Sequence, residues 1–129
     1  MRVVAVSQRV DVFADRRERR DALDQKIVHF LLASGFMAVP VPNIFTTAPN
    51  SDVPGRYLEA FMNRVMPHAL CLSGGNDIGE SPERDETEFW MLGYAEQKKL
   101  PTLGICRGMQ IMAFRAGASL EPITGHRRT

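Results

Sequence analysis

Short apolar runs alternate along this chain with longer segments in which apolar residues recur at helical spacing. A short apolar run bounded by polar or turn-forming residues is typical of a buried strand, whereas apolar residues at i, i+4 and i+7 are typical of an amphipathic helix. The pattern predicts strands at residues 3–6, 36–41, 69–73 and 101–105. It predicts helices at residues 15–34, 57–66, 85–99 and 107–116.

Local signals refine these boundaries. Gly35 is a natural end for the first helix, and Asp85 with Glu88 matches a capping box at the start of the third. Residues 40–55 hold four of the eight prolines, which predicts a long surface loop. The basic residues within 16–20 are interrupted and followed by acidic ones, so we interpret them as the solvated start of the first helix.

Alternating strands and helices predict an α/β fold with a mostly parallel sheet covered by helices on both faces, a three-layer arrangement. In such sheets functional groups lie at the carboxyl ends of the strands. Two predicted loops at that edge carry unusual residues, at 73–77 after the third strand and at 106–108 after the fourth.

Cys106 lies in a Gly-x-Cys-x-Gly string between a predicted strand and a predicted helix. A nucleophile elbow needs small residues two positions before and after the nucleophile, and Gly104 and Gly108 satisfy that requirement. The positive end of the following helix would favour the thiolate, with Arg107 as a nearby cation. The alternative is that Cys106 is a small buried residue that ends a strand. Cys71, in the middle of an apolar run, is predicted to be a core residue.

The Gly74-Gly75 pair ends the neighbouring strand of the same predicted edge. Acyl transfer needs backbone N–H donors aimed at the developing oxyanion, and a glycine pair can turn an amide toward the pocket. The amide of Arg107, directly after the nucleophile, would be the second donor. The alternative for the glycine pair is a plain turn.

Composition limits the other classes of function. A chain of 129 residues has room for one domain, and 44% hydrophobic with 24% charged residues is the composition of a globular protein. A formal charge of +1 argues against electrostatic binding of nucleic acid. No apolar run is long enough to span a bilayer or to act as a signal peptide, and two cysteines are too few for a disulfide scaffold, so a cytoplasmic location is expected. No metal-ligand spacing or phosphate loop is present, so no metal and no cofactor is expected.

Three strings carry a family resemblance: Leu-Ser-Gly-Gly-Asn-Asp at 72–77, Arg-Asp at 84–85 with Glu88, and Leu-Gly-Ile-Cys-Arg-Gly-Met-Gln at 103–110. Together they resemble the class I glutamine amidotransferases, and in particular the γ-glutamyl hydrolase branch that includes γ-glutamyl-γ-aminobutyrate hydrolases. The opening Ser-Gln-Arg at 7–9, together with residues 18–25, also resembles members of that branch that include a γ-glutamyl-CDP-amidate hydrolase. The resemblance covers residues 1 to about 120 and implies a flavodoxin-like fold.

By that resemblance, Cys106 attacks a γ-glutamyl amide and forms a γ-glutamyl thioester, which water or an amine then resolves. The amides of Gly75 and Arg107 would form the oxyanion hole, and Gly74 and Gln110 would bind the substrate. Gln110 is equally well explained as an ordinary polar position on a helix.

The family's His-Glu pair lies many tens of residues beyond its cysteine, whereas 23 residues follow Cys106 here. His29, His68 and His126 are poor substitutes, because they fall in the first helix, before the third strand and in the tail. We therefore expect residues 1–129 to be an incomplete domain whose C-terminal portion is absent, with little activity alone.

The expected partners are a small γ-glutamyl substrate and either a complementing C-terminal fragment or a second copy of the chain. Neither nucleic acid nor a membrane is expected as a partner. Two alternatives remain: a non-catalytic module that keeps the pocket for binding or regulation, and a thiol-reactive redox sensor.

Overall fold

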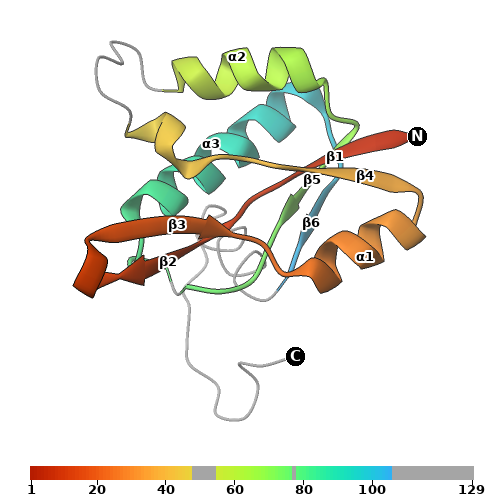
Figure 1. Cartoon of the computed structure of the whole chain (residues 1–129). Helices are drawn as coiled ribbons and strands as arrows, with labels where there is room; N and C mark the ends of the chain where they lie inside the picture. Colours follow the sequence, from red (N-terminus) through yellow and green to blue (C-terminus); the bar gives the residue numbers. More distant parts are fainter. Residues whose placement is uncertain (48–54, 77, 106–129) are drawn as a thin grey trace, which may run out of the picture.

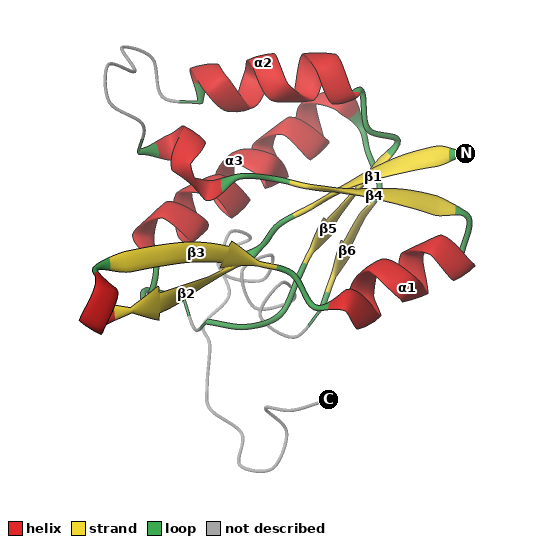
Figure 2. Ribbon diagram, viewed as in Figure 1, coloured by secondary structure: helices red, strands yellow, loops and turns green. Residues whose placement is uncertain are grey.

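The centre of the molecule is a four-stranded parallel sheet (Figures 1 and 2). The computed structural model describes residues 1–47, 55–76 and 78–105. The strands lie in the order β4-β1-β5-β6. Their bounds are Arg2–Val6 for β1, Phe36–Pro40 for β4, Ala69–Leu72 for β5 and Thr102–Gly104 for β6. All three pairings are parallel, which confirms the predicted α/β fold.

The strand order gives the sheet a topological switch point between β1 and β5. The chain crosses from β1 to β4 on one side and then returns past β1 to form β5 on the other. Connections on opposite sides leave a crevice at the carboxyl ends of the two central strands, where ligands bind in folds of this kind. The register brings the ends of these strands level, with Val6 opposite Cys71.

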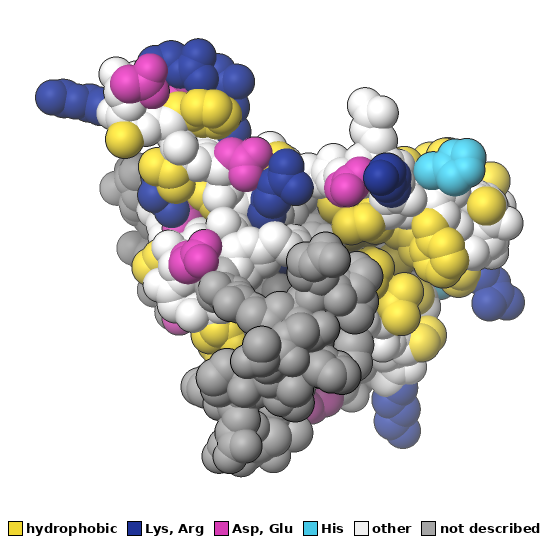
Figure 3. Space-filling view, turned by 90° about the horizontal axis from the view of Figure 1, so that it is seen from below, with side chains coloured by type: hydrophobic (Ala, Val, Ile, Leu, Met, Phe, Trp, Pro, Cys, Tyr) yellow, Lys and Arg dark blue, Asp and Glu magenta, His cyan; other side chains and the backbone are white. Residues whose placement is uncertain are grey.

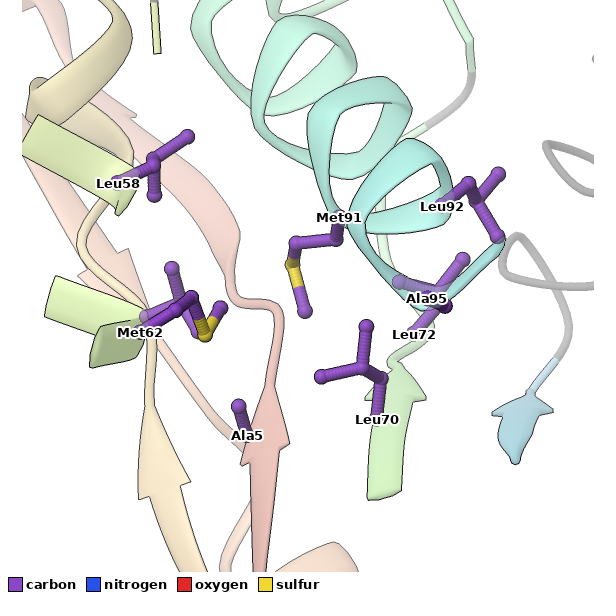
Figure 4. Close-up of a cluster of buried hydrophobic side chains, with 9 residues drawn as sticks. Ala5, Leu58, Met62, Leu70, Leu72, Met91, Leu92 and Ala95 are labelled. Carbon is purple, nitrogen blue, oxygen red and sulfur yellow. The ribbon is translucent and has the colours of Figure 1, made fainter. Parts of the chain in front are cut away.

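Helices cover both faces of the sheet and give the three predicted layers. One face packs against α2, Arg56–Val65, and α3, Pro82–Lys98, and the other packs against α1, Gln25–Ala33. Side chains alternate along each strand, so Leu70 and Leu72 face α3 while Cys71 faces α1. Figure 4 shows the larger cluster, which comprises Ala5, Val41, Leu58, Met62, Leu70, Leu72, Met91, Leu92 and Ala95.

The prediction of one helix over residues 15–34 is wrong in its first half. The chain instead forms an antiparallel hairpin of β2, Arg9–Phe13, and β3, Glu18–Ala22, joined by a short 3-10 turn η1, Ala14–Arg16. Residues 15–21 contain no apolar side chain that a helix could bury, so helical periodicity begins only at Leu23. Strict alternation of strands and helices is therefore broken once.

The basic cluster lies on this hairpin and not at a helix start. Arg17 turns the chain in a left-handed conformation, with φ of 51°. The guanidinium groups of Arg16 and Arg20 lie 4.6 and 5.0 Å from the centre of the Phe13 ring. These cation–π contacts and cross-strand pairs stabilise a segment whose side chains are mostly charged. α1 follows only after Asp24, whose carboxylate accepts a hydrogen bond from the Lys26 amide at 2.8 Å.

The predicted capping box at Asp85 is also wrong. α3 begins three residues earlier, with Ser81 at the N-cap position and Pro82 in the first turn, where proline costs no hydrogen bond. Asp85 accepts a hydrogen bond from the Gly79 amide at 2.9 Å, and Glu88 is buried. The predicted loop at 40–55 contains a short 3-10 helix η2, Asn43–Thr46. The helix predicted at 107–116 lies outside the described residues.

Within the described ranges, every helix is too short or too polar to cross a bilayer.

Candidate functional site

The candidate site lies at the carboxyl edge of the sheet, next to the switch point. Gly74 and Gly75 leave the end of β5 there, and the Ile105 amide donates to the Leu72 carbonyl at 2.9 Å, so the chain after β6 is still paired with β5. Cys106 is the next residue of the sequence. Cys106, Arg107 and Gln110 lie outside the described residues, so their predicted roles stay predictions.

Gly75 requires glycine for two reasons. Its φ is +94°, a left-handed conformation that other residues adopt at a cost. A Cβ atom at this position would also lie 2.8 Å from Cδ and 2.9 Å from Cβ of Arg9. Gly74 beside it is half-buried. The glycine pair is therefore a constrained turn against which a side chain of the hairpin packs closely.

A buried ion pair on α3 supports this turn. Arg84 and Glu88, one turn apart on α3, are both fully buried and lie 3.2 Å apart. The guanidinium of Arg84 also donates to the Ser73 carbonyl at 2.5 Å. Isolated buried charges are strongly unfavourable, so each of these groups depends on its partners. The carbonyl immediately before Gly74 is thus held by a charge-assisted hydrogen bond.

Two serines connect this ion pair to both central strands. The Ser7 hydroxyl, just after β1, donates to Glu88 at 2.5 Å and accepts a hydrogen bond from the Ser73 amide at 3.0 Å. The Ser73 hydroxyl in turn donates to the Ser7 carbonyl at 2.7 Å. Ser7, Ser73, Arg84 and Glu88 thus form one hydrogen-bonded group, which we call the edge network. It fixes the ends of β1 and β5 at the point where they separate.

Asn76 attaches the hairpin to the same turn. Its side chain accepts from the Val10 amide at 2.8 Å and donates to the Val10 carbonyl at 3.0 Å. On the other side of the hairpin, the Asn43 amide donates to Asp21 at 3.0 Å. The hairpin therefore stands over the carboxyl edge, fixed at its base to the loop that contains Gly75 (Figure 1).

Cys71, the other cysteine of the chain, is not a nucleophile candidate. Cys71 is fully buried, and burial, with a smaller contribution from the charge of Glu88, raises the pKa of its thiol to about 11. A neutral thiol at physiological pH is unreactive. The prediction that Cys71 is a core residue is confirmed.

The described histidines lie away from the carboxyl edge. His68 precedes β5 at the amino edge, where its Nδ1 accepts a hydrogen bond from the Val3 amide at 3.0 Å. His29 is exposed on α1. His126 lies outside the described residues. Over residues 1–47, 55–76 and 78–105, no group of three His, Cys, Asp or Glu side chains is arranged to hold a metal ion.

The edge network is not predicted from the sequence. Arg84 and Glu88 occur in the family strings, but the sequence pattern predicts a helix-capping role for Glu88. One signal could have identified it: Arg84 and Glu88 share the helical face of Met91 and Ala95, so both charges fall on the buried stripe of α3. The pairing of Asn76 with Val10, 66 positions away in sequence, left no local signal.

Comparisons with known proteins give relatives of part of this chain. The γ-glutamyl-γ-aminobutyrate hydrolase of Escherichia coli is 27% identical over 106 residues, covering 77% of this chain and 41% of that protein. The γ-glutamyl-CDP-amidate hydrolase of Campylobacter jejuni is 36% identical over 64 residues, covering 45% of this chain and 32% of that protein. A putative glutamine amidotransferase of Mycobacterium tuberculosis is 36% identical over 77 residues, covering 46% of this chain and 25% of that protein.

The chain thus spans less than half the length of these curated relatives. A family model described as Peptidase C26 matches residues 3–124, which include the four described strands of the parallel sheet apart from Arg2, and the Gly-Ile-Cys-Arg-Gly string. The parallel sheet, the glycine turn at its carboxyl edge and this match agree: the chain belongs to the Peptidase C26 family of enzymes, of the class I glutamine amidotransferase type.

Proposed function

We propose that this chain carries the nucleophile and oxyanion-binding part of a cysteine-dependent hydrolase of γ-glutamyl amides. The single observation that carries the proposal is the Gly75 turn, which follows β5 and is held by the hydrogen bond from buried Arg84 to the Ser73 carbonyl. The neighbouring strand β6 ends at Gly104, two residues before Cys106. A rigid backbone donor next to a cysteine that follows a strand is the arrangement that acyl transfer requires. The names of the relatives indicate the substrate class, γ-glutamyl conjugates or glutamine.

In the proposed reaction, the Cys106 thiolate attacks the γ-carbonyl carbon and the carbonyl electron pair moves onto oxygen. The Gly75 and Arg107 amides donate hydrogen bonds to that oxyanion, and Gly74 and Gln110 position the glutamyl group. Collapse of the intermediate breaks the C–N bond, and the amine leaves with a proton from a general acid. Water then cleaves the γ-glutamyl thioester, which releases glutamate and returns the thiol.

The proton transfers need a base and acid at the carboxyl edge, and neither His29 nor His68 lies there. We therefore propose that the His-Glu pair comes from a C-terminal segment, either in a longer chain or in a complementing fragment. The positions of His29 and His68 also favour a second candidate function, a module that binds γ-glutamyl ligands without turning them over.

Active-site labelling tests the proposal. A glutamine analogue with an electrophilic diazoketone should add to Cys106 in the 129-residue chain, as read by intact mass and peptide mapping. Cys106→Ser should abolish the adduct, and Cys71→Ser should leave it unchanged. Labelling of Cys71 alone, or equal labelling of both thiols, would refute the nucleophile assignment. Protection of Cys106 by glutamine with no adduct and no turnover would favour the binding module.

A further inference from the structure

Arg9 lies directly on the turn that the proposed function uses for the oxyanion. The position of a Cβ on Gly75 would be within 3 Å of two carbons of the Arg9 stem, so that stem packs on the glycine α-carbon. The guanidinium begins one bond beyond Cδ, the nearer of these atoms. A positive charge is therefore carried next to the proposed carbonyl-binding position.

The position of Arg9 is fixed by the base of the hairpin. Val10, its neighbour, makes two hydrogen bonds with the Asn76 side chain, and Ser7, two residues earlier, is part of the edge network. Arg9 itself is the first residue of β2 and pairs with Ala22 of β3. Because the backbone on both sides of Arg9 is held, its side chain starts from a fixed position, which reduces the entropy lost on binding a ligand.

The guanidinium of Arg9 keeps binding capacity. Its Nε donates to Asp11 at 3.0 Å, and within the described residues no partner is found for its two terminal nitrogens. The side chain is 42% exposed. Two terminal N–H groups in one plane match the oxygens of a carboxylate or a phosphate.

Two other arginines of the hairpin bind carboxylates through two nitrogens each: Arg19 binds Glu83 at 2.7 and 2.9 Å, and Arg20 binds Glu18 at 3.3 and 2.9 Å. Arg16, like Arg9, contacts its carboxylate through Nε, but it lies in the turn of the hairpin and not at its base. Figure 3, which looks onto this edge, shows Lys and Arg side chains interspersed with Asp and Glu over the hairpin at upper left. The hairpin thus has no uniform positive field, and any selectivity for anions would come from the local position of Arg9.

We infer that Arg9 is a specificity-determining residue whose guanidinium binds an anionic group, carboxylate or phosphate, of the γ-glutamyl substrate. The inference rests on the proposed function, because it places that substrate's carbonyl at Gly75. Two parts of the substrate can supply this anionic group: the α-carboxylate of the glutamyl unit and an acidic group on the leaving amine. The test distinguishes them.

The first measurement compares two alkylating agents of similar size at Cys106 of the full 129-residue chain: iodoacetate, which is anionic, and iodoacetamide, which is neutral. Arg9→Gln should lower the iodoacetate-to-iodoacetamide rate ratio about threefold to fivefold, the size expected of a half-exposed ion pair. Arg9→Lys should restore part of the preference. Arg16→Gln is the matched control, since it removes the same charge about 14 Å further along the hairpin.

The second measurement uses γ-glutamylglycine and γ-glutamylglycinamide, which differ only in the charge of the leaving amine, to protect Cys106 from iodoacetamide. If Arg9 binds the leaving amine, Arg9→Gln should weaken protection by γ-glutamylglycine alone. If it binds the α-carboxylate, both peptides should weaken equally. Either result supports the inference.

An unchanged alkylation ratio in Arg9→Gln, with the thermal midpoint of the wild-type chain retained, would overturn the inference. Failure of both peptides to protect wild-type Cys106 would instead count against the proposed function. The alkylation ratio would still decide whether Arg9 selects anions.

Discussion

Leu70 and Ser73 are three residues apart on one buried stretch of chain, yet different forces hold them. Leu70 lies in the middle of the sheet among apolar side chains of α2 and α3. Ser73, at the carboxyl edge, is bound by a serine and by the buried arginine of α3. Apolar packing is non-directional and tolerates exchange of similar side chains, whereas the edge network needs particular donors and acceptors at particular distances. The middle of the sheet stabilises the fold, and the edge fixes the position of a loop.

The largest effect should come from breaking the edge network. Glu88→Ala leaves Arg84 buried and without its carboxylate, so the free energy of unfolding should fall by about 3–5 kcal/mol. Urea denaturation followed by circular dichroism measures it. Glu86→Ala, on the exposed side of the same helix, should change stability by less than about 0.5 kcal/mol. Equal losses in the two variants would show that the network is not essential.

A double variant separates stability from loop position. Arg84→Met with Glu88→Leu replaces the ion pair by apolar side chains, which should recover much of the stability. The double variant also removes the hydrogen bond to the Ser73 carbonyl, so the diazoketone analogue should label Cys106 more slowly than in the wild-type chain. Wild-type labelling rates in this variant would mean that the network has only a structural role.

In the middle of the sheet, Leu70→Ala should cost about 2–5 kcal/mol, because it leaves a cavity in the larger core cluster. Its effect on Cys106 labelling should be small under conditions where the chain is folded. Val12→Ala, at a position 58% exposed on the hairpin, should cost far less. A strong effect of Leu70→Ala on labelling of the folded chain would contradict the contrast between the two regions.

Two glycines isolate the effect of close packing at the edge. Gly75 and Gly35 have similar φ values, +94° and +89°, but a Cβ at Gly35 meets no atom within 4 Å whereas one at Gly75 meets Arg9. Gly35→Ala should therefore cost about 1 kcal/mol for backbone strain alone, and Gly75→Ala should cost more. Gly75→Ala combined with Arg9→Ala removes the contacts with Cδ and Cγ but keeps the one with Cβ, so it should recover part of the difference in thermal denaturation. If Gly35→Ala and Gly75→Ala lower the stability by the same amount, the contact with Arg9 adds no strain.

The smallest effect concerns the ion pair between β3 and α3. Hydrogen bonding to Arg19 lowers the pKa of the Glu83 carboxyl below its ordinary value of 4.5. A lowered folded-state pKa stabilises the fold at pH above the ordinary value, and this contribution disappears as the pH falls through the lowered pKa. Arg19→Gln should therefore cost less than about 1 kcal/mol at pH 7 and nothing in strong acid, as measured by urea denaturation at each pH. A difference independent of pH would contradict this assignment.

The pattern of apolar residues along the chain was sufficient to predict the central sheet and its helices. Apolar runs and helical periodicity predicted four parallel strands and the helices that cover them, and the position of Cys71 in an apolar run predicted its burial. The family strings predicted the Peptidase C26 relationship. The roles of Cys106, Arg107 and Gln110 stay predictions, as do those of Gly74 and Gly75, although the structure places both glycines at the expected edge.

Only the tertiary structure revealed how the edge is held. Hairpin residues 9–22 carry mostly charged side chains, and their conformation depends on cross-strand pairs and on contacts with α3 and Asn76. The contacts with α3 and Asn76 join residues more than 60 positions apart in sequence. The burial of Arg84 and Glu88 is supported by hydrogen bonds with Ser73, at the end of β5, and with Ser7, 81 positions before Glu88 in sequence. Arg9 reaches Gly75 across 66 positions. Periodicity records which side of an element is buried, but a polar contact between distant segments exists only once the fold has brought its two partners together.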